Sequence, residues 1–234
     1  YPAINVYHGV QDGQDGQLIA YAGDYMRTVA GNNYLITETN AQGTGWDSKS
    51  QYPPYDNQLR QNVYSHYASG ANMVEYWHWA TLHYGQETYW RGVIGHDLQP
   101  NRVYREFQRT ARELEKIGSD IVNLKKNNKV AILYSHDSHH ALTFMPYHNG
   151  GGYPVDANYP VDLVHKALYF QNIETDIVPC DRMRDFSKYS MLVIPPLYVA
   201  DDSLLMSIDK FVKDGGYVVM MHKSGYCNEH SAVR

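Results

Sequence analysis

The stretch that decides the fold is residues 3–37, AINVYHGVQDGQDGQLIAYAGDYMRTVAGNNYLIT. Its two ends, 3–8 and 34–37, are short apolar runs that predict strands. Residues 17–30 repeat apolar side chains at helical spacing, and the Gly and Asn residues at 31–33 then stop that helix and turn the chain. Strand, helix, strand is the unit from which parallel α/β sheets are built.

The same alternation continues along the first half of the chain. The patterns predict a helix over 56–69, a strand over 72–79, and a helix that Asn101 caps and that reaches Lys116 or beyond. Three strand–helix units therefore precede residue 126, whereas a closed (β/α) barrel needs eight. The loops after the strands are rich in Gly, His and aromatic residues, which is typical of the edge where such enzymes place their chemistry.

A polar, basic segment around Lys125–Lys129 predicts a domain boundary, with one domain at 1–126 and another at 127–234. The second domain alternates helices at 161–172 and 201–216 with buried strands at 130–135, 175–180, 190–196 and 217–222. This pattern predicts an open, doubly wound sheet of the flavodoxin type. No glycine-rich phosphate motif follows its first strand, where residues 135–140 read SHDSHH, so nucleotide binding receives little support.

Composition excludes several classes of function. Apolar residues make up 43% and charged residues 19% of the chain, and no apolar run is long enough to cross a bilayer, so we expect no membrane partner. The net charge is −5 and the basic residues are scattered, which argues against nucleic acid. The cysteines, Cys180 and Cys227, lack ligand spacing, so we predict no metal and no cofactor. The 22 tyrosines suit a surface that stacks on sugars.

Glu38 is the first candidate for a catalytic residue. It follows the apolar run Leu35-Ile36-Thr37 and precedes the polar segment 40–43, so the pattern puts it at the carboxyl end of a strand, where a barrel opens. The alternative is a carboxylate that only bonds to neighbouring backbone at a strand end. Position alone does not separate these two readings.

Four segments taken together favour a catalytic role for Glu38. Residues 5–9 (NVYHG), 36–46 (ITETNAQGTGW), 70–98 (GANMVEYWHWATLHYGQETYWRGVIGHDL) and 100–107 (PNRVYREF) closely resemble the final strands of glycoside hydrolase family 42. That family comprises retaining β-galactosidases with a (β/α)8 TIM barrel. The second half resembles the family's middle domain, a flavodoxin-like (glutamine-amidotransferase-like) unit through which these enzymes usually trimerise. The resemblance implies that the chain holds the C-terminal portion of the barrel and an incomplete trimerisation domain.

The resemblance also implies roles for five residues. Glu38 matches the catalytic nucleophile, and Trp46 matches a residue that lines the galactose subsite. Glu87 and Trp90 match positions that contact sugar hydroxyls, although many relatives carry His in place of Trp90. Tyr7 matches a tyrosine expected to hydrogen-bond the nucleophile.

The expected function is hydrolysis of terminal, non-reducing β-D-galactosyl residues by double displacement. The family's acid/base glutamate would lie upstream of this sequence, so we expect the 234-residue chain alone to be inactive. Two alternatives stay open: a noncatalytic carbohydrate-binding or assembly module, and a related α-L-arabinopyranosidase. The expected partners are a β-galactoside and either further copies of the chain, a trimer in the family, or a missing barrel segment; the expected location is the cytoplasm.

Overall fold

The computed structural model describes residues 1–43, 45, 52–146 and 159–234. The chain forms two compact units, Tyr1–Lys126 and Asn127–Arg234. Every pairing between named strands is parallel in both units, which confirms the predicted α/β class.

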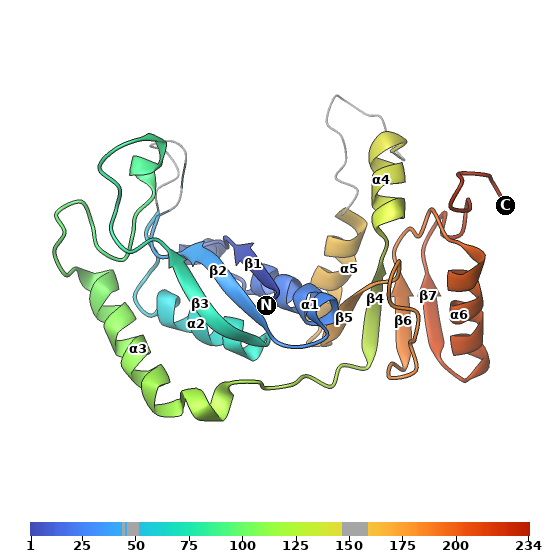
Figure 1. Cartoon of the computed structure of the whole chain (residues 1–234), viewed down its shortest axis with the longest axis horizontal. Coiled ribbons are helices and arrows are strands. Elements are labelled where there is room, and N and C mark those ends of the chain that lie inside the picture. Colours follow the sequence, from blue (N-terminus) through green and yellow to red (C-terminus); the bar gives the residue numbers. More distant parts are fainter. Residues whose placement is uncertain (44, 46–51, 147–158) are drawn as a thin grey trace. The chain divides into compact units, whose positions relative to one another are not determined.

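The first unit contains a three-stranded sheet in the order β1-β2-β3 (Figure 1). Strands and helices alternate along the chain as β1 (Ala3–Val6), α1 (Gln17–Ala30), β2 (Tyr34–Asn40), α2 (Gln58–Ala68), β3 (Ala71–Trp77) and α3 (Arg102–Ile121). Two short 3-10 helices, η1 (Gln11–Gly13) and η2 (Gln86–Tyr89), lie in the loops. The strands thus neighbour one another in chain order, as successive βα units of a barrel do.

Local signals fix where these helices begin and end. Gly31, at φ +62°, closes α1 in the left-handed conformation that glycine adopts without steric cost. Asn101 caps α3 as predicted, since its side chain accepts a hydrogen bond from the Tyr104 backbone N–H at 3.0 Å. Helix α1 packs against β1 and β2, and α2 packs against β3.

The core of the first unit lies between the helices and one face of the sheet. It includes Ile19 and Met26 from α1 and Tyr34 and Ile36 from β2, all buried. β1 and β3, by contrast, carry exposed side chains, among them Asn5 and Glu75. One face of this sheet is therefore polar and open to solvent.

The second unit contains a four-stranded sheet in the order β5-β4-β6-β7 (Figure 1). Its elements are β4 (Val130–Tyr134), α4 (His136–Phe144), α5 (Tyr159–Tyr169), β5 (Thr175–Pro179), β6 (Met191–Ile194), α6 (Asp202–Lys213) and β7 (Tyr217–Met220). Numbered within the unit, the order is 2-1-3-4, the start of the flavodoxin arrangement. This confirms the predicted doubly wound sheet, and β5 is buried along its whole length.

Several expected boundaries shift. β1 ends at Val6, so Tyr7 directly follows the strand, and β2 continues to Asn40, so Glu38 lies inside its strand near the carboxyl end. Helix α4 was not predicted, because its polar sequence HDSHHALTF lacks helical periodicity. In the part of the chain that the structure describes, no helix combines the length and apolar composition needed to cross a bilayer.

Candidate active site

The Glu38 carboxylate accepts hydrogen bonds from two side chains, Asn5 of β1 and Tyr7, which directly follows β1. The Tyr7 hydroxyl donates to Oε1 of Glu38, and the Asn5 side-chain amide donates to Oε2 at 3.0 Å. Glu38 is only half-buried, so its carboxylate stays accessible from the open face of the sheet. Each carboxylate oxygen therefore has its own donor while the group remains reachable by a ligand.

A β-bulge in β2 aims this carboxylate. Ile4 of β1 pairs with Ile36, but the next residue, Asn5, pairs with Glu38, so β2 carries one extra residue at Thr37. The pairing of β2 with β3 shifts in the same stretch, between Ile36 and Thr39. Bulges of this kind bend a strand locally and re-aim a side chain, and they are common beside active sites.

Tyr7 is held in place from the other side by Trp90. Their rings meet edge to face with centroids 4.8 Å apart and an interplanar angle of 83°. Burial, then the hydrogen bond to Glu38, then the charges of Glu38 and Glu87 raise the pKa of Tyr7 above its ordinary value. The phenol therefore keeps its proton at any physiological pH and acts as a donor to Glu38.

The loops that follow β2 and β3 are tied to each other. The Gln42 side-chain amide donates to the Gly92 carbonyl at 2.6 Å, and the Arg91 backbone N–H donates to the Gly43 carbonyl at 3.0 Å. This pairing fixes the segment that carries Glu87, which is half-buried, and Trp90, which is buried. Trp90 contacts the Tyr7 ring, and the charge of Glu87 acts on the Tyr7 hydroxyl. Both residues therefore lie close to the Tyr7–Glu38 pair.

Not every predicted site residue can be placed. Trp46 lies outside the described residues. Trp79, after β3, meets the rings of Tyr104 and Phe107 of α3 edge to face, with centroids 6.0 Å away in each case. Among residues 1–43, 45, 52–146 and 159–234, no group of three or more His, Cys, Asp or Glu residues is placed to hold a metal ion.

Two histidines near this edge of the sheet differ in burial: His8 is half-buried and His66 is fully buried. His8 follows Tyr7, and its backbone N–H donates to the Asn40 side chain at 3.2 Å. His66 of α2 is fully buried 6.1 Å from the His8 ring, and neither of its ring nitrogens has a partner among the described residues. Burial, and secondarily the charge of His8, lowers the pKa of His66 to about 3; burial also lowers the pKa of His8.

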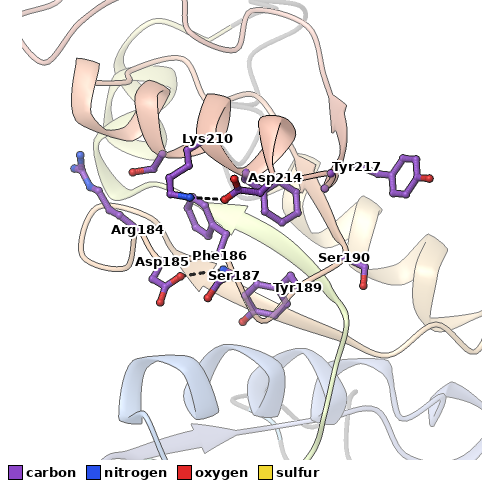
Figure 2. A pocket seen from close by; sticks show the side chains of 13 residues that line it. Arg184, Asp185, Phe186, Ser187, Tyr189, Ser190, Lys210, Asp214 and Tyr217 are labelled. Atoms are coloured by element: carbon purple, nitrogen blue, oxygen red, sulfur yellow. Dashed lines mark hydrogen bonds and ion pairs between the residues drawn. The ribbon is translucent and has the colours of Figure 1, made fainter.

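A groove of about 460 Å³ lies in the second unit, between the end of α6 and the loop before β6 (Figure 2). Lys210 forms an ion pair with Asp214, and Arg184 pairs with Asp201 by two hydrogen bonds of 2.5 and 2.7 Å. Asp185 accepts a hydrogen bond from the Ser187 backbone N–H at 3.0 Å. Phe186 and Phe211 form apolar walls and meet edge to face. The groove lies at the amino ends of β6 and β7, whereas open α/β sheets bind ligands at the carboxyl ends.

Asp181 lies at the carboxyl edge of the second sheet and binds the start of α4. One of its oxygens accepts a hydrogen bond from the Ser135 hydroxyl at 2.9 Å, and the other accepts one from the His136 backbone N–H at 2.7 Å. The start of α4, where a phosphate could otherwise bind, is therefore occupied by the chain's own carboxylate. The best-formed candidate site is the one around Glu38.

An accessible carboxylate whose two oxygens are fixed by donors can attack an electrophilic carbon or accept a proton. Sequence reasoning identified Glu38, Tyr7, Glu87 and Trp90, and the structure brings Tyr7 directly onto Glu38. It missed Asn5 and Thr37. The one available signal was the spacing of Asn5 and Tyr7, two residues apart along a strand and hence on one face.

Comparison with known proteins agrees with this geometry. A carboxylate at the carboxyl end of parallel βα units lies where (β/α) barrel enzymes place their catalytic residues. The family model described as "Beta-galactosidase" of glycoside hydrolase family 42 matches residues 1–117, and the family's "Beta-galactosidase trimerisation domain" matches residues 128–234. The chain belongs to glycoside hydrolase family 42.

Individual relatives match over nearly the whole chain. β-Galactosidase BgaA of Clostridium cellulovorans is 28% identical over 97% of this chain and 33% of its own length, and β-galactosidase GanA of Bacillus subtilis is 26% identical over 91% and 31%. The solved β-galactosidase of Rahnella sp. R3 superposes with a TM-score of 0.87 at 25% identity, over 99% of this chain and 34% of that one. The chain thus spans about a third of the length of these relatives, and the predicted barrel fold is confirmed.

Proposed function

We propose that this chain supplies the nucleophile of a retaining β-galactosidase and that Glu38 is this nucleophile. The observation that carries the proposal is the carboxylate of Glu38, half-buried at the carboxyl end of β2 and held by Tyr7 and Asn5. Membership of family 42 supports the choice of β-galactosides as substrates. The fixed donors support nucleophilic attack, because they leave the carboxylate in one orientation.

In this reaction a carboxylate oxygen of Glu38 attacks the anomeric carbon and forms a galactosyl ester as the glycosidic bond breaks. An acid/base glutamate protonates the departing oxygen and later takes a proton from the water that hydrolyses the ester. Retaining enzymes hold the two carboxyl groups about 5–5.5 Å apart. We place that second group outside residues 1–234, with Trp46, Glu87 and Trp90 contacting the sugar.

The test uses the longest natural polypeptide that contains residues 1–234, here called the complete protein. We expect it to hydrolyse 4-nitrophenyl β-D-galactopyranoside and to release β-galactose first, as seen by proton NMR. Faster hydrolysis of the α-L-arabinopyranoside would move the substrate assignment to that sugar. Galactose binding without hydrolysis of either glycoside would contradict the proposal and favour a noncatalytic module.

The match of residues 128–234 to a trimerisation domain indicates that proteins of this family assemble through this unit. We propose that the complete protein is a homotrimer formed through residues 127–234, and that further barrel strands cover the open edges of β1 and β3. Light scattering of the complete protein tests the trimer; a monomeric mass would contradict it. The cytoplasmic location stays a prediction.

A further inference from the structure

We infer that Asn5 is a positioning residue for Glu38 and that the bulge at Thr37 locks the Asn5 side chain in the productive orientation. This inference rests on the proposed function of Glu38 and adds to it two residues from the open face of the sheet. The link between them is direct: Asn5 donates to Glu38 at 3.0 Å and accepts from the Thr37 hydroxyl at 3.0 Å.

The bulge makes this arrangement possible. In a regular strand, consecutive side chains point to opposite faces of the sheet. Thr37 and Glu38 are consecutive, yet both hydrogen-bond the same Asn5 side chain, because β2 carries its extra residue at this point. A strand without the bulge would present only one of the two side chains to Asn5.

The Glu38 carboxylate and the Thr37 hydroxyl together fix how the Asn5 amide is oriented. An amide has an oxygen that only accepts and a nitrogen that only donates. An ionised carboxylate only accepts, so Glu38 selects the Nδ2 end, because a flipped amide would set its oxygen against the Glu38 oxygen. The Thr37 hydroxyl, which can donate or accept, then holds the other end by donating to Oδ1. The pair therefore turns an exposed and otherwise free amide into a fixed donor.

The remaining polar groups around Glu38 assign Asn5 a distinct task. Tyr7 donates to Oε1, whereas Asn5 donates to Oε2. Glu87 lies close enough for its charge to raise the pKa of Tyr7, so the site carries two carboxylates. Fixing both oxygens of Glu38 defines the plane of its carboxylate, which one donor alone would leave free to rotate.

The experiment measures two rates in variants of the complete protein. The first is the rate of inactivation by a 2-deoxy-2-fluoro-galactosyl fluoride, which reports attack by the nucleophile. The second is kcat/KM for an activated nitrophenyl galactoside. The variants are Asn5→Ala, Thr37→Val and Thr37→Ser, with Thr39→Val as the matched control, because the Thr39 hydroxyl is buried without a partner among the described residues.

We expect Asn5→Ala to slow inactivation about 10-fold or more, because a misplaced reacting group costs up to roughly 10²-fold. kcat/KM should fall by a similar factor, because both rates report attack by the same carboxylate. Thr37→Val should show both effects more weakly, Thr37→Ser should restore them, and Thr39→Val should change neither.

The failures are distinguishable. If Glu38 of the unaltered protein takes up no label, both the proposed function and this inference are wrong. If Glu38 is labelled but both rates of Asn5→Ala and Thr37→Val stay within twofold of those of the unaltered protein, only the inference is overturned. Should Asn5→Ala fail to fold, the comparison of Thr37→Val with Thr37→Ser decides alone.

Discussion

Both sheets of this chain are parallel, and each has a carboxylate near the carboxyl ends of its strands. The hydrogen-bond donors around the two carboxylates differ. In the first unit Glu38 lies on an open face with side-chain donors, Tyr7 and Asn5, on its two oxygens. In the second unit Asp181 is bound by Ser135 and by the backbone N–H of His136, at the start of α4. The same chemical group is thus available for reaction in one unit and caps a helix in the other.

The difference shows that a strand-end carboxylate becomes a candidate catalyst through what surrounds it. A helix N-terminus stabilises a carboxylate by its dipole and its unpaired N–H groups. Side chains from a neighbouring strand orient the carboxylate and leave it reachable.

The largest effect is expected from Glu38→Gln. In the complete protein we predict a fall in kcat of about 10³-fold or more, because an amide cannot form the glycosyl ester. Steady-state hydrolysis of nitrophenyl β-D-galactopyranoside measures it. Asp181→Asn is the matched control and should keep kcat within about twofold; equal losses in both variants would break the comparison.

Tyr7→Phe should reduce kcat/KM by about 10- to 100-fold. The change removes a donor to Oε1 of Glu38, and hydrogen bonds to charged groups contribute about 1.5–3 kcal/mol. Tyr76→Phe is the control, because the Tyr76 hydroxyl is buried on β3 without a partner among the described residues. Normal kinetics in Tyr7→Phe would show that Tyr7 does not assist Glu38.

The buried His66 should make the stability of the first unit depend on pH. The folded state holds the pKa of His66 at about 3, below the ordinary value near 6.5, so the unfolded state binds a proton first as pH falls. The free energy of unfolding therefore decreases as the pH falls below about 6.5. Between pH 7.5 and 5.5 the loss is about 1.4 kcal/mol, or tenfold in the protection of α2 amides from hydrogen exchange.

The measurement is hydrogen exchange of the complete protein, corrected for the intrinsic pH dependence of exchange. His66→Leu should remove most of the loss in α2, whereas His140→Gln, at an exposed position, should leave it intact. An unchanged pH dependence in His66→Leu would contradict the assignment.

The smallest effect is expected from Asp181→Asn on stability. The variant loses the charge at the start of α4 and should destabilise this helix by about 1 kcal/mol. Faster hydrogen exchange of α4 amides would report the change, with no matching change in α6, which Asp201 caps through the Leu204 N–H. No change in α4 would mean that Asp181 does not serve as its cap.

The sequence predicted those helices and strands that have a regular spacing of apolar residues and a clear local stop signal. Helix α1 was predicted over its observed bounds, because its periodicity and the glycine at its end are both local signals. The last part of β2 was missed because Glu38, Thr39 and Asn40 are polar, and polar residues in a strand are read as loop unless the partner strands are known.

The site was predictable only in part. Glu38 was first chosen from its position after an apolar run, and resemblance to a family added Tyr7, Glu87 and Trp90. Asn5 and Thr37, by contrast, depend on the register between β1 and β2. Register is a long-range property that one strand does not reveal, and a shift of one residue changes which side chains share a face. The bulge therefore had to be observed.

The central claim is that Glu38 attacks the sugar. The most direct test is mass spectrometry of peptides from the complete protein after reaction with a 2-deoxy-2-fluoro-galactosyl fluoride, which traps the ester. The account predicts one fluorogalactosyl group on the peptide that contains Glu38, and none on the peptide that contains Asp181. A label on any other carboxylate, or none on Glu38 while the enzyme is inactivated, would contradict it.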